Sequence, residues 1–233
     1  MNPETWTAVD RYFSDLLIAP DPALDAALAA SAAAGLPSIH VTPAQGKLLH
    51  LLARSVRARR ILEIGTLGGY STIWLARALP AGGRLVTLEA EAQHAEVARA
   101  NLARAGVSGV VDLRLGRAQE TLPQLAAGGA GPFDLIFIDA DKSGYAEYFA
   151  WALQLAHAGT LIIADNVVRK GAVVDAASTD AAVQGVRRFN AALAAEARVV
   201  ATVVQTVGEK GYDGLALALV LADRQPRGVT TAG

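Results

Sequence analysis

The chain has 233 residues, of which 52% are hydrophobic and 18% charged, with a formal net charge of −1 and no cysteine. A chain of this length can build one sizeable core, and its near-neutral charge without long basic runs argues against binding to nucleic acid or to an anionic membrane. The lack of cysteine excludes disulfides, thiolate catalysis and cysteine-based zinc sites, so we expect a soluble cytoplasmic protein.

The first 58 residues are expected to form a helical cap. They begin with MNPETWTAVDRYF, which carries acids and lacks an apolar segment, so no signal peptide is predicted. The rest of this region is rich in alanine and predicts helices interrupted at Pro20–Pro22 and at Gly35–Pro37. We expect one domain, made of this cap over residues 1–58, a core over residues 59–222 and a frayed tail over residues 223–233.

From residue 60 onward, short apolar runs alternate with longer helical patterns. The runs are RILEI (60–64), RLVTLE (84–89), VVDLRLG (110–116), FDLIFI (133–138) and GTLIIA (159–164). Parallel strands that are covered by helices on both faces have nearly continuous apolar sequences joined by helical segments. The alternation therefore predicts a mostly parallel sheet, and no run is long enough to span a membrane.

The last third of the chain departs from this pattern. Residues 167–180 are polar and contain glycine, which predicts a loop, and a helix is expected from about residue 181 to residue 197. Two apolar stretches, RVVATVVQTV and DGLALALVLA, follow with only GEKGY between them, and so short a connection suits an antiparallel pair. The predicted fold is therefore α/β: a Rossmann-like, doubly wound sheet of seven strands, mostly parallel, with a C-terminal antiparallel hairpin and helices on both faces.

The segment ILEIGTLGGYST (61–72) predicts a strand, a glycine-rich turn and the start of a helix. Glycines in such a turn let the backbone approach a ligand, and the helix N-terminus offers free N–H groups. Ser71 stands where it can cap this helix or bind a ligand carboxylate. The spacing matches neither G-x-G-x-x-G, nor a P-loop, nor the elbow of hydrolases. An ordinary tight turn is the alternative.

Two acids near this turn favour a nucleoside ligand. Glu63 lies inside the first strand, where a carboxylate is costly unless it has a partner. Glu89 ends the second strand, the position at which nucleotide-binding α/β folds place an acid for the ribose hydroxyls. An acid at a strand end can also be merely solvated, but the turn and both acids together favour an adenosine-type ligand.

A second acidic cluster follows strands four and five. Asp139 and Asp165 each stand just beyond an apolar run, and parallel neighbours lie about 4.8 Å apart. Two carboxylates that close repel each other unless they share a proton or a cation. With the amide oxygen of Asn166 they offer three hard ligands, which suit magnesium, manganese or calcium rather than zinc. A pair of helix N-caps is the alternative interpretation.

Lys142 is a candidate general base beside this cluster. The chain has only four lysines among its 21 basic residues, so lysine is not its usual cation. Arginine cannot give up its proton in proteins, whereas lysine can when burial or a neighbouring cation lowers its pKa. A surface lysine paired with Asp141 is the alternative.

These stretches together resemble a known family. The chain is similar to the class I S-adenosylmethionine-dependent O-methyltransferases, in particular to the cation-dependent catechol and caffeoyl-CoA group and its compact bacterial members. The matching stretches run in family order over about residues 38 to 222: ILEIGTLGGYST, RLVTLE, GRAQETLPQL, FDLIFIDADKSGY, GTLIIADNVV and YDGLALA. The resemblance implies methylation of one hydroxyl of an aromatic vicinal diol by S-adenosylmethionine, with a divalent cation (magnesium first, manganese or calcium next), in a homodimer.

The resemblance also implies roles for individual residues. Glu63 would hold the methionine amino group, Ser71 the methionine carboxylate and Glu89 the ribose hydroxyls. Further positions that match cofactor contacts are Val41, Gly65, Thr66, Gly69, Ala118, Gln119 and Asp141. The three metal ligands would be Asp139, Asp165 and Asn166, and the catalytic residues Lys142 and Asp139.

Two departures leave the acceptor open. A glutamate that grips a substrate hydroxyl in the catechol enzymes is matched here by Val207, and the loop VRKGAVVDAASTD (168–180) lacks the aromatic residues of the plant enzymes. A metal-independent or N-directed small-molecule methyltransferase on the same fold is the main alternative. A non-catalytic cofactor-binding module would not need both the metal ligands and Lys142, and the glycine spacing disfavours a dehydrogenase.

Overall fold

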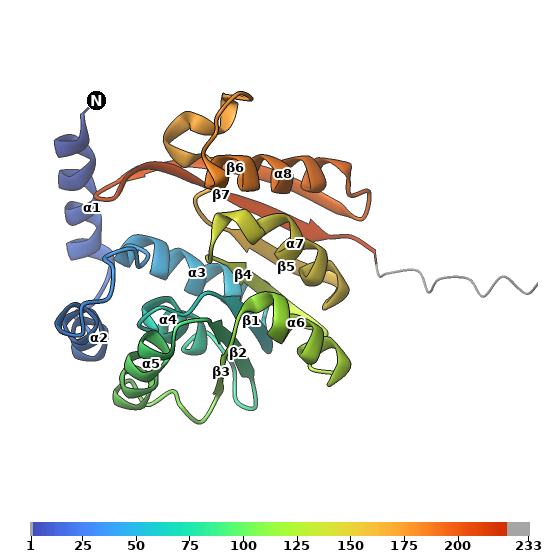
Figure 1. Cartoon of the computed structure of the whole chain (residues 1–233). Helices are drawn as coiled ribbons and strands as arrows, with labels where there is room; N and C mark the ends of the chain where they lie inside the picture. Colours follow the sequence, from blue (N-terminus) through green and yellow to red (C-terminus); the bar gives the residue numbers. More distant parts are fainter. Residues whose placement is uncertain (1, 223–233) are drawn as a thin grey trace, which may run out of the picture.

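One sheet of seven strands organises the computed structural model, which describes residues 2–222 (Figure 1). The strands are β1 (Arg60–Ile64), β2 (Arg84–Glu89), β3 (Val111–Leu115), β4 (Phe133–Ile138), β5 (Ala156–Ala164), β6 (Val199–Gly208) and β7 (Gly211–Val220). Their order is β3-β2-β1-β4-β5-β7-β6, with β7 antiparallel to both neighbours and all other pairs parallel. The predicted fold class is confirmed, and the predicted tail lies outside the described residues.

Helices fill the connections and the N-terminal region. They are α1 (Pro3–Leu17), α2 (Pro22–Ala33), α3 (Pro43–Ser55), α4 (Tyr70–Ala76), α5 (Ala92–Arg104), α6 (Ala118–Ala127), α7 (Tyr145–Gln154) and α8 (Ala181–Ala195), with short 3-10 turns at η1 (Lys142–Gly144) and η2 (Arg169–Val174). The predicted loop 167–180 thus contains a short turn of helix. No helix within residues 2–222 is long and apolar enough to cross a membrane.

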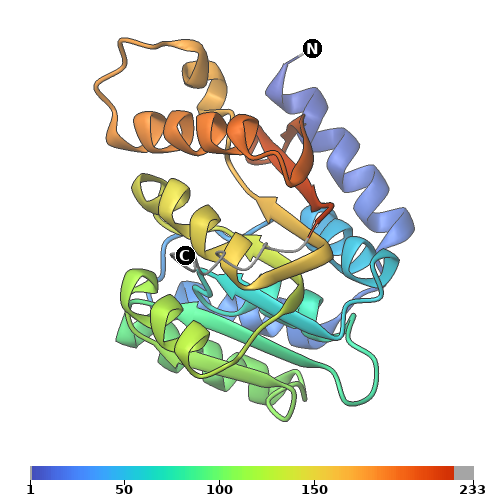
Figure 2. The same ribbon diagram turned by 90° about the vertical axis from the view of Figure 1, so that its right-hand side faces the viewer.

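Side chains along the central strands point alternately to the two faces of the sheet, so the core has two layers. In β4, Leu135 and Phe137 join a cluster with α2, α3, α4 and α5, whereas Ile136 and Ile138 face a cluster built from α6, α7 and α8. Successive strand residues point to opposite faces, so a continuous apolar run serves both layers. Figure 2 shows α6, α7 and α8, in green to orange, on one side of the strands and α3, in light blue, on the other.

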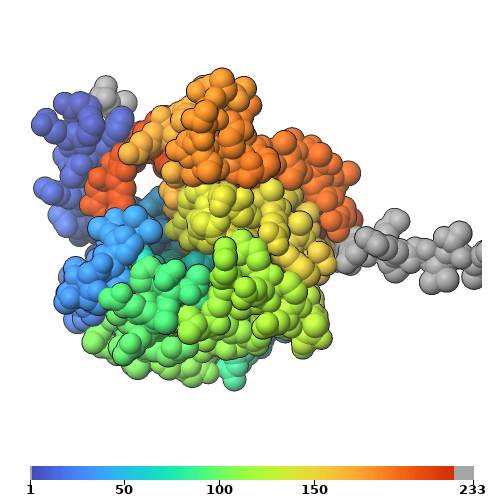
Figure 3. Space-filling view, viewed as in Figure 1, coloured from blue at the N-terminus to red at the C-terminus, as the bar shows by residue number. Residues whose placement is uncertain are grey.

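The N-terminal helices begin where the sequence places proline after a capping residue. Asn2, Asp21 and Thr42 each cap a helix through a side-chain oxygen, and the predicted interruptions separate the three helices. Helix α1 packs on β6, where the Glu209 N–H donates to Asp10 Oδ2 at 2.8 Å. Figure 3 shows α1, in blue, projecting beside the tip of the β6–β7 hairpin, so this end of the molecule exposes a helix and an edge strand together.

Candidate active site

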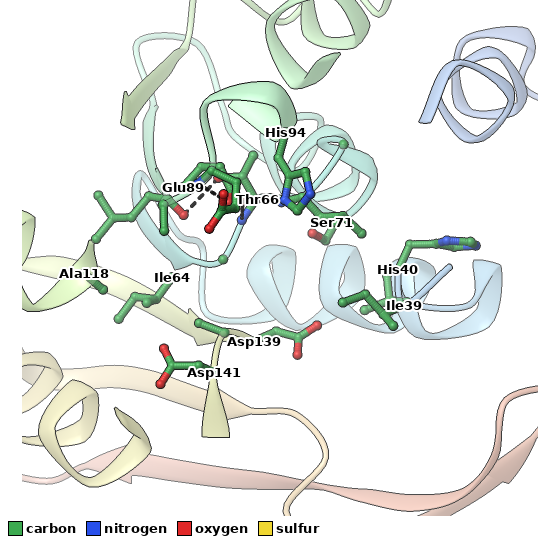
Figure 4. Close-up of a pocket in the computed structure, with 18 of the residues that line it drawn as sticks. Ile39, His40, Ile64, Thr66, Ser71, Glu89, His94, Ala118, Asp139 and Asp141 are labelled. Atoms are coloured by element: carbon green, nitrogen blue, oxygen red, sulfur yellow. Dashed lines mark hydrogen bonds and ion pairs between the residues drawn. The ribbon is translucent and has the colours of Figure 1, made fainter. Parts of the chain in front are cut away.

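A cavity of about 850 Å³ opens at the carboxyl ends of the parallel strands, where open α/β sheets place their ligands (Figure 4). Eleven of the predicted site residues line it: Val41, Gly65, Thr66, Ser71, Glu89, Ala118, Gln119, Asp139, Asp141, Lys142 and Asn166. Asp165 lines a smaller adjoining cavity of about 270 Å³. Neither cavity includes Glu63 or Gly69 in its walls.

The glycine turn after β1 packs against the backbone that follows β4 and also lines the cavity. Gly65 has φ +102°, and a Cβ there would lie 2.1 Å from the carbonyl oxygen of Asp139, so only glycine fits. Gly69 has φ +85° and stands at the N-cap of α4 without a side-chain bond. The turn therefore brings the ends of β1 and β4 into backbone contact and places the start of α4 at the cavity.

Glu63 lies beneath the cavity floor and is fully buried. Its Oε1 accepts a hydrogen bond from Ser71 Oγ at 2.6 Å, and its Oε2 accepts from the hydroxyls of Thr72 and Thr87. Burial raises the pKa of the Glu63 carboxyl to about 7, against the lowering effect of these hydroxyls. Of the two alternatives for Ser71, helix capping is wrong, because its hydroxyl donates to Glu63 and Gly69 stands at the N-cap, while binding of a ligand carboxylate stays a prediction.

The raised pKa of Glu63 predicts a pH-dependent stability. The pKa of this carboxyl is raised from 4.5 to about 7 in the folded state. Its contribution to the stability of the fold is therefore complete below pH 4.5 and is lost as the pH rises from 4.5 through about 7. At about 1.36 kcal/mol for each pH unit, the loss totals about 3 kcal/mol. Urea unfolding of the ligand-free protein at pH 4.5 to 7.5 should show a fall that includes this contribution, and Glu63→Gln should make the fall smaller by that amount.

Glu96, an exposed residue of α5, offers the matched control, because Glu96→Gln should leave the pH slope of the wild type intact. Equal slopes for Glu63→Gln and the wild type would contradict the assignment.

Glu89 braces the glycine turn from the end of β2. Its Oε2 accepts from the backbone N–H groups of Thr66 at 3.2 Å and of Leu67 at 2.7 Å. Its Oε1 accepts from the Glu91 N–H at 3.0 Å and lies 3.4 Å from His94 Nδ1. Figure 4 shows Glu89 and Thr66 on one wall of the cavity, with Asp139 and Asp141 on another. Glu89 is therefore held rigidly at the cavity, although no sequence signal indicated its contacts with the turn.

The two strand-end aspartates are neighbours, as predicted. Ile138 of β4 pairs with Ala164 of β5, and the ladder continues as the Asp165 N–H donates to the Ile138 carbonyl at 3.0 Å. Asp165 is 4% exposed, and burial together with the charge of Asp139 raises its pKa to about 7. Neither aspartate caps a helix, because Asp141 caps η1 and Val168 precedes η2 without a side-chain bond. The N-cap interpretation is therefore wrong.

Lys142 contacts one of these two aspartates. Its ammonium donates to Asp139 Oδ1 at 2.8 Å and to Tyr145 Oη at 2.7 Å, and its side chain is 11% exposed. The fully buried Tyr145 hydroxyl lies 2.9 Å from the Asp165 carbonyl oxygen, to which it donates. The alternative of a surface lysine paired with Asp141 is therefore wrong.

Comparison with known proteins decides the family. The model of the family described as O-methyltransferase matches residues 21–221. The chain is 58% identical over 220 residues to a catechol O-methyltransferase of Niastella koreensis (94% of this chain and 100% of the relative) and 54% identical over 212 residues to one of Mycobacterium tuberculosis (91% and 94%). The chain belongs to the O-methyltransferase family.

Solved structures agree with this assignment. The O-methyltransferase from Bacillus cereus in complex with SAH has a TM-score of 0.93 at 56% identity and covers 94% of this chain and 100% of its own. One from Streptomyces achromogenes, involved in tomaymycin synthesis and in complex with SAM, has a TM-score of 0.92 at 55% identity, with 95% and 100% covered. This O-methyltransferase therefore shares its whole described fold with relatives solved in complex with SAM or its product form.

Asp141 has structural partners in this O-methyltransferase. Its Oδ2 accepts from Ser143 Oγ at 2.7 Å and from the Gly144 N–H at 3.1 Å, while its Oδ1 accepts from the Tyr148 hydroxyl. Gln119 Nε2 donates to the same Tyr148 oxygen at 3.0 Å. The network joins Asp141 to Gln119 across the cavity wall, so a contact with the cofactor stays a prediction for both.

Asp213 was missed by the sequence reasoning. From β7, its Oδ1 accepts from the backbone N–H groups of Val168 at 3.0 Å, Arg169 at 2.9 Å and Gly214 at 3.0 Å. It thereby fixes the segment that follows Asn166, whose own φ is +57°. The acid beside a glycine in YDGLALA was visible in the sequence, but its partners Val168 and Arg169 lie more than 40 residues away.

Proposed function

We propose that this O-methyltransferase methylates one hydroxyl of a catechol-type small aromatic molecule with the help of a divalent cation. S-adenosylmethionine-dependent O-methyl transfer itself is supported by the family, by the named relatives at 54–58% identity and by the SAH and SAM complexes of the neighbours. The convergence of Asp139, Asp165, Asn166 and Lys142 at the junction of the two cavities carries the proposal.

The residues at this junction fit a hard divalent cation. Within residues 2–222 no three histidine, cysteine or carboxylate side chains come close enough to hold a metal by themselves, so the set needs the Asn166 amide. Two carboxylates and an amide oxygen suit magnesium, with manganese or calcium as alternatives. The buried Asp165 beside Asp139 supports this fit, because two like charges need a counter-charge, and the Lys142 ammonium contacts Asp139 directly but acts on Asp165 only from a distance.

Lys142 is the proposed general base. An ammonium has three donor positions, and Asp139 and Tyr145 occupy two of them, which leaves one direction for an acceptor hydroxyl. A divalent cation beside that hydroxyl would favour its ionised form. In its neutral amine form Lys142 Nζ would take the proton from the hydroxyl and become the ammonium. The fixed ends of β4 and β5 would hold the attacking oxygen in place, which contributes several kcal/mol in well-oriented reactions.

The larger cavity is the proposed site of S-adenosylmethionine. Glu89 would accept hydrogen bonds from the ribose hydroxyls, and Ala118 and Gln119 would line the adenine. Val41, Thr66 and Ser71 line the same cavity. Glu63 would act from below, where the Ser71 hydroxyl already contacts it. The smaller cavity, which adjoins Asp165 and Asn166, is then the acceptor site.

A set of three acceptors tests the proposal. With labelled S-adenosylmethionine and magnesium, catechol should be methylated, whereas resorcinol and phenol should not, because only vicinal oxygens can share one cation. Methylation of phenol at the rate of catechol would contradict the proposal and favour the metal-independent alternative.

A cytoplasmic homodimer remains part of the proposal. Exposed apolar residues gather on two adjacent elements: Val9, Tyr12, Phe13, Leu16 and Leu17 on α1, and Val200, Val203, Val204 and Val207 on the edge strand β6. Contiguous apolar surface and an unpaired edge both favour association. Sedimentation equilibrium distinguishes the dimer from the monomer.

A further inference from the structure

The smaller cavity has a distinct chemical character. Its volume of about 270 Å³ suits one aromatic ring with a short substituent. It shares Ile39, His40, Val41 and Asn166 with the larger cavity, so the two meet beside the proposed metal ligands. A ring whose hydroxyls lie at that junction would extend its substituent toward the β6–β7 hairpin and the segment after β5.

Two lysines lie in this part of the wall, Lys170 and Lys210. Lys170 is exposed, and its ammonium has no hydrogen-bond or ion-pair partner within residues 2–222. Its backbone has φ +55°, a left-handed conformation that costs a lysine about 1 kcal/mol or more. Such strain at a cavity wall is more typical of a functional position than of a loop free to relax.

Among the residues that the structure describes, Lys210 forms no ion pair, although the carboxylates of Glu209, Asp139 and Asp165 act on its ammonium from farther away. Its ammonium donates to the carbonyl oxygens of Ser38 and His40, which satisfy hydrogen bonds but carry no net charge, and it has no carboxylate partner in the described chain. Burial lowers the pKa of the neighbouring His40, and the charge of Lys210 lowers it further, so His40 is neutral at pH 7. Lys170 and Lys210 are therefore the cationic side chains that this wall offers to a ligand.

The acids of the same wall are all engaged elsewhere. Asp165 belongs to the proposed metal set. Asp213 accepts three backbone N–H bonds and lies 3.9 Å from the Arg169 guanidinium. Asp10 accepts the Glu209 N–H. The contacts of these carboxylates fix their positions, whereas neither ammonium group lies within ion-pair distance of a carboxylate in residues 2–222.

We infer that the smaller cavity selects acceptors whose ring substituent ends in a carboxylate, with Lys170 and Lys210 as its counter-charges. The inference rests on the proposed function, since it takes the vicinal hydroxyls to lie beside Asp165 and Asn166. The apolar walls contributed by Leu48, Val207 and Leu215 would hold the ring itself whatever its charge. The substituent charge should therefore act mainly through KM, because it binds ground state and transition state alike.

Three acceptors of equal length test this: 3-(3,4-dihydroxyphenyl)propionate, 4-propylcatechol and dopamine. In the wild type kcat/KM should fall in that order, by about tenfold or more from the anion to the cation, and added salt should reduce the spread. Lys170→Met should lower kcat/KM for the propionate alone, and Lys170→Glu should reverse the preference. Lys210→Met should have the same effect as Lys170→Met. Of the two, Lys170→Met is less disruptive to the fold, because it breaks no hydrogen bond.

Lys47, which lies on α3 over the Trp74 ring, offers the matched control, and Lys47→Met should leave the order unchanged. Equal kcat/KM for all three acceptors, in the wild type and in Lys170→Met, would overturn the inference and leave the proposed function standing. Methylation of none of the three would overturn both.

Discussion

Replacing Lys142 with arginine is expected to lower kcat by about 10²- to 10⁴-fold, the usual contribution of a positioned general base. Arginine keeps the positive charge that Asp139 contacts but does not give up a proton. Binding of S-adenosylmethionine, measured by calorimetry, should stay unchanged, which separates loss of the base from loss of the fold. Steady-state rates with catechol at saturating cofactor and magnesium give the comparison.

Lys47→Arg is the matched control for this experiment, because Lys47 stacks on Trp74 and lines neither cavity. It should retain the wild-type kcat. Full activity in Lys142→Arg would remove the proton-acceptor role and leave Lys142 as a structural partner of Asp139 and Tyr145.

Asp165→Ala is expected to lower cation affinity by more than about 100-fold, because loss of a direct ligand should cost more than the 10- to 100-fold typical of an outer partner. Binding of manganese, followed by electron paramagnetic resonance, measures this without reference to activity. The thermal stability of the ligand-free protein should not fall, because the change removes a buried carboxylate that faces Asp139.

Asp112→Ala provides the control, since Asp112 is an exposed carboxylate on β3 that pairs with Arg114. It should bind manganese like the wild type. An Asp165→Ala protein that binds manganese with wild-type affinity would show that the cation, if any, lies elsewhere.

The topology and the strand-end residues were predictable because they depend on patterns local in sequence. An apolar run that ends in a polar residue predicts both a buried strand and the residue at its carboxyl end. Asp139, Asp165 and Asn166 could therefore be placed together before any contact was known. The same reasoning identified Glu63 as an acid that needs a partner and placed Glu89 at the end of the second strand.

The partners themselves were not predictable, since they come from distant elements. Glu63 meets Ser71, Thr72 and Thr87 only after β1, β2 and α4 pack, so the contact that rules out helix capping by Ser71 could not be predicted. The pairing of Lys142 with Tyr145 was open to sequence reasoning, because residues three apart face each other on a helical turn. The charge of the smaller cavity's wall depends on Lys170 in η2 and on Lys210 in the β6–β7 connection, which lie far apart in the sequence.

Removal of divalent cations tests the central claim most directly. Protein treated exhaustively with a chelator should transfer no labelled methyl group from S-adenosylmethionine to catechol, and added magnesium should restore the activity. Calorimetry on the same sample should show that the cofactor still binds, so that loss of activity reports on the site of Asp139, Asp165 and Asn166. An undiminished rate after chelation would contradict the account.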